Sequence, residues 1–363
     1  MTTLNIKGRI MAVLHGEEPD KVPFLPYDNL ILRGELEREL RTKDMGFCVR
    51  CGTVWSEQPN VTVESSDKGN VATTIYKTPS GCLSKSVRTH LGRGVEYQEL
   101  QGLIKSEDDY DAAILMVEDT VYHEDYDNYH NAVRDLGCDG IVRGSGIEPP
   151  YYDSSWFFWP SLADWVVAQY KHKHEFQKLV RALERRAERL LPFIIDSPAE
   201  FISFGGVSGH YGPPQFEKYD LPFYQMYTRT LKGKGKICSA HAHSSTLKCL
   251  KHLIGRTGLD VIEAFTPPPI GDLSVSEARR AWGKDVVLWV NFPETIFWNG
   301  PDETMKYTAD LLRSDPPGNR LVIGMTEMGT TGIKDAESEG VYRLGMHALV
   351  DAINAYGKYP IKP

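Results

Sequence analysis

A regular alternation of helical and apolar segments constrains the fold of this chain more than any other feature. Residues 174–194 have the apolar spacing of an amphipathic helix, and the short apolar segment 199–209 follows them. The same order recurs at 222–235 and 236–243, and at least six such units follow one another from about residue 105 onward. Parallel strands need crossover connections, so this order predicts a parallel β-sheet covered by helices.

We expect these units to close into a (β/α)8 TIM barrel. No GxGxxG motif follows the first strand, which favours a barrel over a doubly wound sheet. Residues 6–15 predict an N-terminal helical extension, and residues 60–100 predict a β-rich antiparallel insertion because polar and apolar residues alternate between turn signals. No linker interrupts the chain, so residues 1–363 are expected to form a single barrel domain.

The composition excludes several classes of protein. Lys and Arg number 41 and Asp and Glu 49, which gives a net charge of −8, and the absence of a basic cluster argues against nucleic acid as a partner. No segment approaches the ~20 apolar residues of a membrane span. Six cysteines without an apolar export segment predict a cytoplasmic protein with free thiols.

The ends of the predicted strands carry a set of possible metal ligands. His241 and His243 end one strand, where residues two apart point to the same side, and Glu263 and Glu327 end later strands. Imidazole nitrogen suits Zn²⁺, and carboxylate oxygen fills remaining positions. We therefore predict zinc held by His241, His243 and Glu327, with Glu263 as a further ligand or catalytic group. The alternative, two histidines that hydrogen-bond to neighbouring groups, stays open.

Other polar and aromatic residues near strand ends are candidates for binding the substrate. His210 and Asn291 are expected to orient it, although either residue could have a structural role. The aromatic run 151–160 is predicted to be a loop, and serves either as a pocket wall or as a hydrophobic plug or subunit interface in a homo-oligomer. The aromatic candidates for the substrate pocket are Tyr27, Trp156, Phe292 and Trp298.

Two stretches resemble the uroporphyrinogen decarboxylase superfamily over most of the chain. Residues 8–23 are similar to its opening helix and Pro-Asp-Arg-Val-Pro turn, and residues 214–255 are similar to its helix entry and the strand that carries a His-x-Cys motif. The decarboxylases have an Arg-Gln-Ala-Gly-Arg stretch near the N-terminus, where this chain has Tyr-Asp-Asn-Leu at 27–30. The resemblance therefore points away from porphyrinogen decarboxylation.

Within that superfamily, the chain more closely resembles the branch of zinc-dependent, corrinoid-linked methyltransferases. In that branch a His-x-Cys motif, a later Cys and an acidic residue bind zinc. Here His241 matches the His, His243 replaces the first Cys, Glu327 falls near the second Cys and Glu263 matches the acidic position. Replacing thiolates with nitrogen and oxygen leaves the metal more electrophilic, which favours an oxygen-containing substrate over a thiol.

The resemblance implies a methyltransferase that acts as a component of a corrinoid-dependent O-demethylase. It would pass a methyl group from a methoxylated, aromatic small molecule to the Co(I) corrinoid of a partner protein, with zinc as a Lewis acid on the ether oxygen. The alternatives are methyl transfer from a methylated corrinoid to tetrahydrofolate or another acceptor, a metal-dependent lyase or hydrolase, and a non-catalytic ligand-binding barrel.

Overall fold

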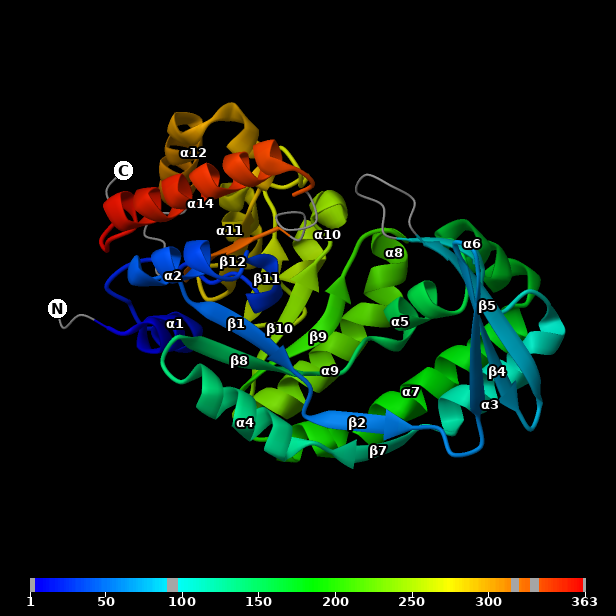
Figure 1. The fold of residues 1–363 in the computed structure, drawn as a ribbon. Coiled ribbons are helices and arrows are strands. Elements are labelled where there is room, and N and C mark those ends of the chain that lie inside the picture. Colours follow the sequence, from blue (N-terminus) through cyan, green and yellow to red (C-terminus); the bar gives the residue numbers. More distant parts are fainter. Residues whose placement is uncertain (1–3, 90–96, 315–319, 327–332, 362–363) are drawn as a thin grey trace. The chain divides into compact units, whose positions relative to one another are not determined.

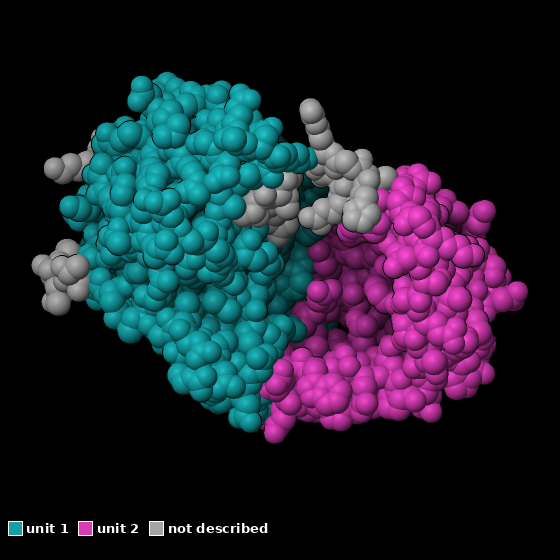
Figure 2. Space-filling model, viewed as in Figure 1, with its two compact units in different colours: residues 1–52, 126–146, 198–363 teal, residues 53–125, 147–197 magenta. Residues whose placement is uncertain are grey.

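The computed structural model describes residues 4–89, 97–314, 320–326 and 333–361. Contacts between residues group the chain into two compact units, shown in different colours in Figure 2. Unit 1 comprises residues 1–52, 126–146 and 198–363, and unit 2 comprises residues 53–125 and 147–197. Each unit is built from more than one stretch of sequence, and the single domain expected above stays a prediction.

Unit 1 contains a parallel sheet of seven strands, as the alternation of helices and apolar segments predicts. Val, Ile, Leu and Phe dominate these strands, which suits a sheet that is buried on both faces. In sheet order the strands are β1 (Phe47–Cys51), β8 (Gly140–Ser145), β9 (Phe201–Val207), β10 (Ile237–Ala242), β11 (Val261–Phe265), β12 (Val287–Phe292) and β13 (Leu321–Met325).

The sheet differs from the eight regular strands of the expected barrel, because β13 and β1 do not pair directly among the described residues. The extended segment 22–27 bonds to both strands instead. The Leu25 amide donates to the Ile323 carbonyl at 2.7 Å, and the Cys48 amide donates to the Pro26 carbonyl at 3.0 Å. Two prolines in this segment lack an amide hydrogen, so it cannot form a continuous ladder.

Helices cover the outer face of this sheet (Figure 1). Several begin with side-chain caps; for example, the Asn5 Oδ1 atom accepts a hydrogen bond from the Gly8 amide at 2.7 Å, and α11 starts with a capping box of Ser274 and Glu277. The helical elements of unit 1 are α1 (Ile6–His15), η1 (Asp28–Leu30), α2 (Glu35–Thr42), α4 (Tyr126–Leu136), α8 (Pro213–Gln215), η3 (Phe216–Asp220), α9 (Leu221–Lys232), η4 (Ser244–Thr246), α10 (Leu247–Ile254), α11 (Val275–Trp282), η5 (Glu294–Asn299), α12 (Pro301–Arg313) and α14 (Ala336–Tyr356).

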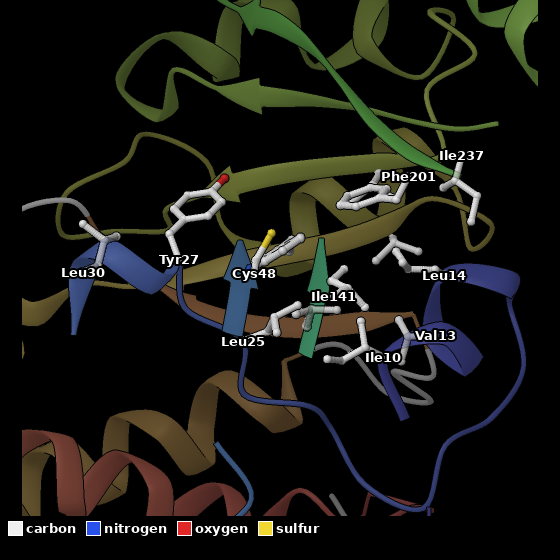
Figure 3. Packing of buried hydrophobic residues seen from close by; sticks show 14 residues of the cluster. Ile10, Val13, Leu14, Leu25, Tyr27, Leu30, Cys48, Ile141, Phe201 and Ile237 are labelled. Atoms are coloured by element: carbon white, nitrogen blue, oxygen red, sulfur yellow. The ribbon is translucent and has the colours of Figure 1, made fainter. Parts of the chain in front are cut away.

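The predicted N-terminal helix packs against the amino-terminal ends of the strands. Ile10, Val13 and Leu14 of α1 are buried in one apolar cluster with the first residues of β9 and β10, Phe201 and Ile237 (Figure 3). The helix ends at His15 and is capped by Gly16, whose φ of 80° lies in the left-handed region that glycine adopts without strain. The amino-terminal end of the sheet is therefore an apolar core.

Unit 2 contains the predicted β-rich insertion. Its four-stranded sheet is antiparallel in the order β3, β4, β5, β6, and a separate antiparallel pair joins β2 and β7. The elements are β2 (Val54–Glu57), β3 (Thr62–Lys68), β4 (Val71–Thr78), β5 (Gly81–Thr89), β6 (Tyr97–Gln101), η2 (Glu107–Asp109), α3 (Tyr110–Glu118), β7 (Val121–Glu124), α5 (Pro150–Phe157), α6 (Leu162–Lys171) and α7 (Lys173–Asp196).

The aromatic run of unit 2 is mostly helical rather than the loop expected from its sequence. Pro150 occupies the first turn of α5, where its missing amide hydrogen costs nothing. The Tyr151 ring packs edge-on against the Trp165 ring, with centroids 5.0 Å apart. Packing within unit 2 thus accounts for some of the aromatic residues in this run. No described helix of either unit is both long enough and apolar enough to cross a membrane.

Candidate functional site

The carboxyl ends of β10 and β11 place His241 beside Glu263. These two residues are register partners in adjacent parallel strands, so their side chains project from the same face of the sheet. Both strands are irregular at this level: the register of β10 shifts between Ala240 and His241, and Ala264 has a φ of 56°. Bulges and left-handed residues re-aim side chains and are frequent at functional sites.

Glu263 is fully buried and is held by two side chains. It forms an ion pair with Arg143 of β8, and the Ser203 hydroxyl of β9 donates to its Oε1 atom at 2.5 Å. Its Oε2 atom is buried and has no hydrogen-bond partner among the described residues. A buried carboxylate oxygen without a partner is costly, so this atom is suited to receive a cation or a donor from a ligand.

Two guanidinium groups lie near the ring of Tyr27. The central carbon of Arg50 is 4.7 Å from the ring centroid and that of Arg143 is 5.7 Å from it, which is within the range of cation–π attraction. Burial, and then the charge of Glu263, raise the pKa of the Tyr27 hydroxyl well above its usual value. Tyr27 is therefore a neutral hydrogen-bond donor at physiological pH.

Three histidines gather near the carboxyl ends of β9 and β10: His241 lies within β10, His243 follows it, and His210 follows β9. The rings of His241 and His243 have centroids 5.7 Å apart and an interplanar angle of 75°. Burial lowers the pKa of His243 to about 4, and the charges of His241 and His210 add to this effect. Burial also lowers the pKa of His210 to about 4, and its Nδ1 atom lies 2.6 Å from the Ser208 hydroxyl oxygen. His210 and His243 are thus neutral at physiological pH, which is the form that binds metals.

The donors fit the predicted zinc ion in kind, although the described residues do not form a complete metal site. Within residues 4–89, 97–314, 320–326 and 333–361, no group of three or more His, Cys, Asp or Glu is arranged to hold an ion. Glu327, the predicted third ligand, lies outside the described residues. Two imidazoles that share a zinc ion at ~2 Å from each nitrogen have ring centroids roughly 5–6 Å apart, which is the separation of His241 and His243.

Asn291 lies inward on β12, close to the neighbouring strand. It is 3% exposed, and it is the register partner of Gly324 on β13. A β-carbon added at Gly324 would lie 2.5 Å from the Asn291 Oδ1 atom and 2.6 Å from the Trp289 Nε1 atom. The glycine therefore makes room for the Asn291 amide at the carboxyl end of the sheet.

Of the other predicted aromatic residues of unit 1, Phe292 and Trp298 lie away from the face that carries Asn291, whereas the Tyr27 ring lies 5.9 Å from the Trp289 ring on that face. Phe292 alternates with Asn291, so it projects to the opposite side of β12, where its ring stacks on that of Phe297 at 5.3 Å. Trp298 is 61% exposed on η5. Trp156 is 52% exposed and belongs to unit 2, whereas Tyr27 is buried in unit 1.

Sequence reasoning did not single out Arg143, Ser203 or Arg50. Arg143 is a lone charge in the buried strand β8, and Ser203 is a lone hydroxyl two residues after the buried Phe201. These residues could have been noticed because each is a polar residue at an inward-facing position of an otherwise apolar strand. Burying such a residue requires a partner. Nothing in the sequence of β11 indicates the left-handed backbone at Ala264.

No protein-family model matches the chain, and no curated protein matches it. Among solved structures, a methyltransferase from Methanosarcina mazei aligns with 15% identity over 97% of this chain and 99% of that chain, with a TM-score of 0.54. A structure of the pneumococcal virulence factor StrH aligns over 93% of this chain and 85% of that chain with 11% identity and a TM-score of only 0.38, too low to compare the folds. The first likeness supports a TIM-barrel-like α/β fold for this chain.

Proposed function

We propose that this protein is a methyltransferase that takes a methyl group from a methoxylated aromatic compound and passes it to the reduced corrinoid of a partner protein. The observation that carries the proposal is the pairing of His241 with Glu263 across β10 and β11, with His243 two residues further on. These side chains lie where TIM-barrel enzymes hold their reactive groups. The similar fold of a methyltransferase supports methyl transfer as the class of reaction.

In this proposal His241 and His243 hold a zinc ion, and Glu263 offers its unpartnered Oε2 atom as a further ligand. Glu327, from beyond β13, is the proposed remaining ligand. When bound, zinc supplies a Lewis acid that stabilises negative charge on an ether oxygen. The Arg143 ion pair and the Ser203 hydroxyl hold the Glu263 carboxylate in one orientation. Such supporting contacts keep a ligand in the geometry that the metal requires.

The chain's own residues prepare the substrate for methyl loss. When the bond between oxygen and methyl carbon breaks, the phenolate keeps the electron pair and the methyl group bonds to the acceptor. A phenol has a pKa near 10, so a phenolate leaves with moderate stabilisation. The Asn291 amide and the neutral His210 imidazole, both near strand ends, are the proposed donors that orient the aromatic ring.

The test measures zinc content and methyl transfer in the same preparations. Purified protein is incubated with free cob(I)alamin and either 4-methoxybenzoate or 4-methoxybenzyl alcohol, and cobalt absorbance reports methylation. We expect wild-type protein to retain zinc, and His241→Ala and His243→Ala to lose zinc and at least ~100-fold in rate, since a Lewis acid contributes several kcal/mol. His252→Ala is the matched control, because His252 is exposed on α10.

Three results would contradict the proposal in different ways. Retention of zinc by both histidine variants would remove the metal site. Methyl transfer from methylcobalamin to tetrahydrofolate, without demethylation of any aryl ether, would favour the reverse half-reaction. Binding of an aryl ether without any methyl transfer, including with added partner corrinoid proteins, would favour a ligand-binding barrel.

A further inference from the structure

Two arginines and a tyrosine occupy neighbouring inward positions on three adjacent parts of the fold, namely β1, β8 and segment 22–27. Arg50 and Arg143 are register partners in β1 and β8, so their side chains project from the same face. Tyr27 forms an isolated parallel bridge with Cys48, two residues before Arg50. Both guanidinium groups approach the Tyr27 ring, as described above. These three side chains form one group, which we call the arginine–tyrosine cluster.

The charges in this cluster do not balance. Arg143 is neutralised by Glu263, whereas Arg50 has no carboxylate within ion-pair distance among the described residues and donates only to the Asn29 amide oxygen at 2.9 Å. One positive charge is therefore left over, in a chain whose net charge is −8. Arg50 is also exposed, so a dissolved anion can reach it.

A second, independent observation distinguishes this place from an ordinary surface arginine. The Tyr27 hydroxyl belongs to a side chain that is 3% exposed, and its oxygen is buried without a hydrogen-bond partner among the described residues. In folded proteins nearly all buried hydroxyls have a partner. A ligand oxygen beside Arg50 would supply one.

We propose that Arg50 and the Tyr27 hydroxyl bind a carboxylate of the substrate, so that the substrate is a methoxylated aromatic acid; this inference rests on the methyltransferase function proposed above. The planar guanidinium group matches the two oxygens of a carboxylate, and the hydroxyl donates a further hydrogen bond. The unused hydrogen-bonding capacity of both groups is thereby satisfied by one planar anion.

Isothermal titration calorimetry of the full-length protein tests the inference separately from catalysis. The two ligands are 4-methoxybenzoate and 4-methoxybenzyl alcohol, which differ mainly in charge. Arg50→Gln is expected to weaken binding of the acid by about tenfold, the loss of one charge-assisted pair, and to change binding of the alcohol by less than about twofold. Tyr27→Phe should weaken acid binding by about threefold. Arg280→Gln, which removes an exposed charge on α11, is the matched control.

The outcomes separate this inference from the proposed function. Equal weakening of both ligands by Arg50→Gln, or no measurable binding of the acid by wild-type protein, overturns the carboxylate site. Demethylation of the alcohol as fast as the acid, unchanged in Arg50→Gln, overturns it while the methyltransferase stands. Arg50-dependent binding of the acid without demethylation of either compound supports the carboxylate site and contradicts the methyltransferase.

Discussion

The two ends of the parallel sheet in unit 1 are built by the same strands but have opposite chemistry. At the amino-terminal end, inward residues such as Ile141, Phe201 and Val261 join one apolar cluster with α1 (Figure 3). Two residues further along β8, β9 and β11 the inward residues are Arg143, Ser203 and Glu263. The apolar core and the candidate site are therefore only two residues apart along each of these strands, which is one repeat of the side-chain alternation.

This difference indicates where changes in sequence should affect stability and where they should affect binding. A substitution in the apolar layer removes buried surface and should lower stability without changing the chemistry of the folded molecule. A substitution in the polar layer disturbs charges that the fold has to bury, and it should affect both stability and binding. The first two of the following four measurements test this division directly, and the other two concern an ion pair and a backbone conformation.

The largest expected effect lies in the apolar layer. Phe201 is 3% exposed and stacks on Trp289 with ring centroids 6.1 Å apart, so Phe201→Ala should lower the free energy of unfolding by ~4 kcal/mol. Urea unfolding measures this loss, and Phe201→Leu, which keeps most of the volume, should cost only ~1 kcal/mol. The rate of the proposed methyl transfer per folded molecule should stay unchanged; a large drop in that rate would contradict the division between the two ends.

The next effect lies in the polar layer. Arg143→Met leaves the fully buried Glu263 carboxylate without its counter-ion and should cost ~3 kcal/mol of unfolding free energy at neutral pH. The double variant Arg143→Met with Glu263→Met removes both charges and should recover much of this loss. Equal unfolding free energies for the single and double variants would show that the buried charge pair contributes little.

A smaller effect concerns the ion pair that ties α1 to the following turn. Arg9 is 2% exposed and its Nε atom lies 2.7 Å from the Asp20 Oδ1 atom. Burial opposes ionisation of Asp20, but the hydrogen bond and charge of Arg9 prevail and lower its pKa. A carboxyl whose pKa is lowered by folding stabilises the protein above its unfolded pKa, and this contribution disappears as the pH falls below about 4.

Asp20→Asn should therefore cost ~2 kcal/mol at pH 7 and less at pH 3, because pH 3 lies below the unfolded pKa of Asp20 and part of the contribution of its charge is then lost. Unfolding free energies measured at both values of pH test this. A constant difference between wild type and variant would mean that the loss does not come from the charge of Asp20.

The smallest effect concerns the backbone beside Glu263. Ala264 has a φ of 56°, a conformation that costs an L-residue ~1–2 kcal/mol and glycine almost nothing. Glycine also loses more chain entropy on folding, roughly 0.5–1 kcal/mol, so Ala264→Gly should stabilise the protein by about 0.5 kcal/mol. Thermal unfolding measures the change, and Ala278→Gly within α11 should instead destabilise by about 1 kcal/mol.

The features that depend on a short repeat were predictable from the sequence. The helix–strand alternation predicts the parallel sheet. The two-residue repeat behind the expected convergence of His241 and His243 holds only within a strand, and His243 lies just beyond the end of β10. The same repeat could have excluded Phe292 from the site, because Asn291 and Phe292 necessarily face opposite sides of β12. The alternating polar and apolar residues at 60–100 likewise predict the antiparallel sheet of unit 2.

Features that depend on distant parts of the chain were not predictable in this way. Arg143 and Glu263 are 120 residues apart, and only the sheet order brings them together. The two prolines of the bridging segment 22–27 favour an extended backbone, but its place between β13 and β1 depends on strands that are far apart in the sequence. The left-handed Ala264 is set by tertiary packing, since its local sequence contains neither glycine nor proline.

The hydrogen bonds of segment 22–27 have a consequence for biosynthesis. This segment leaves the ribosome about 300 residues ahead of β13, whose Ile323 forms two backbone hydrogen bonds with it. Until β13 emerges, that edge of the segment has no β13 partner. Contacts of such long sequence separation form slowly, so the edge of segment 22–27 that pairs with β13 stays open longer during synthesis than the edge that pairs with residues 46–48.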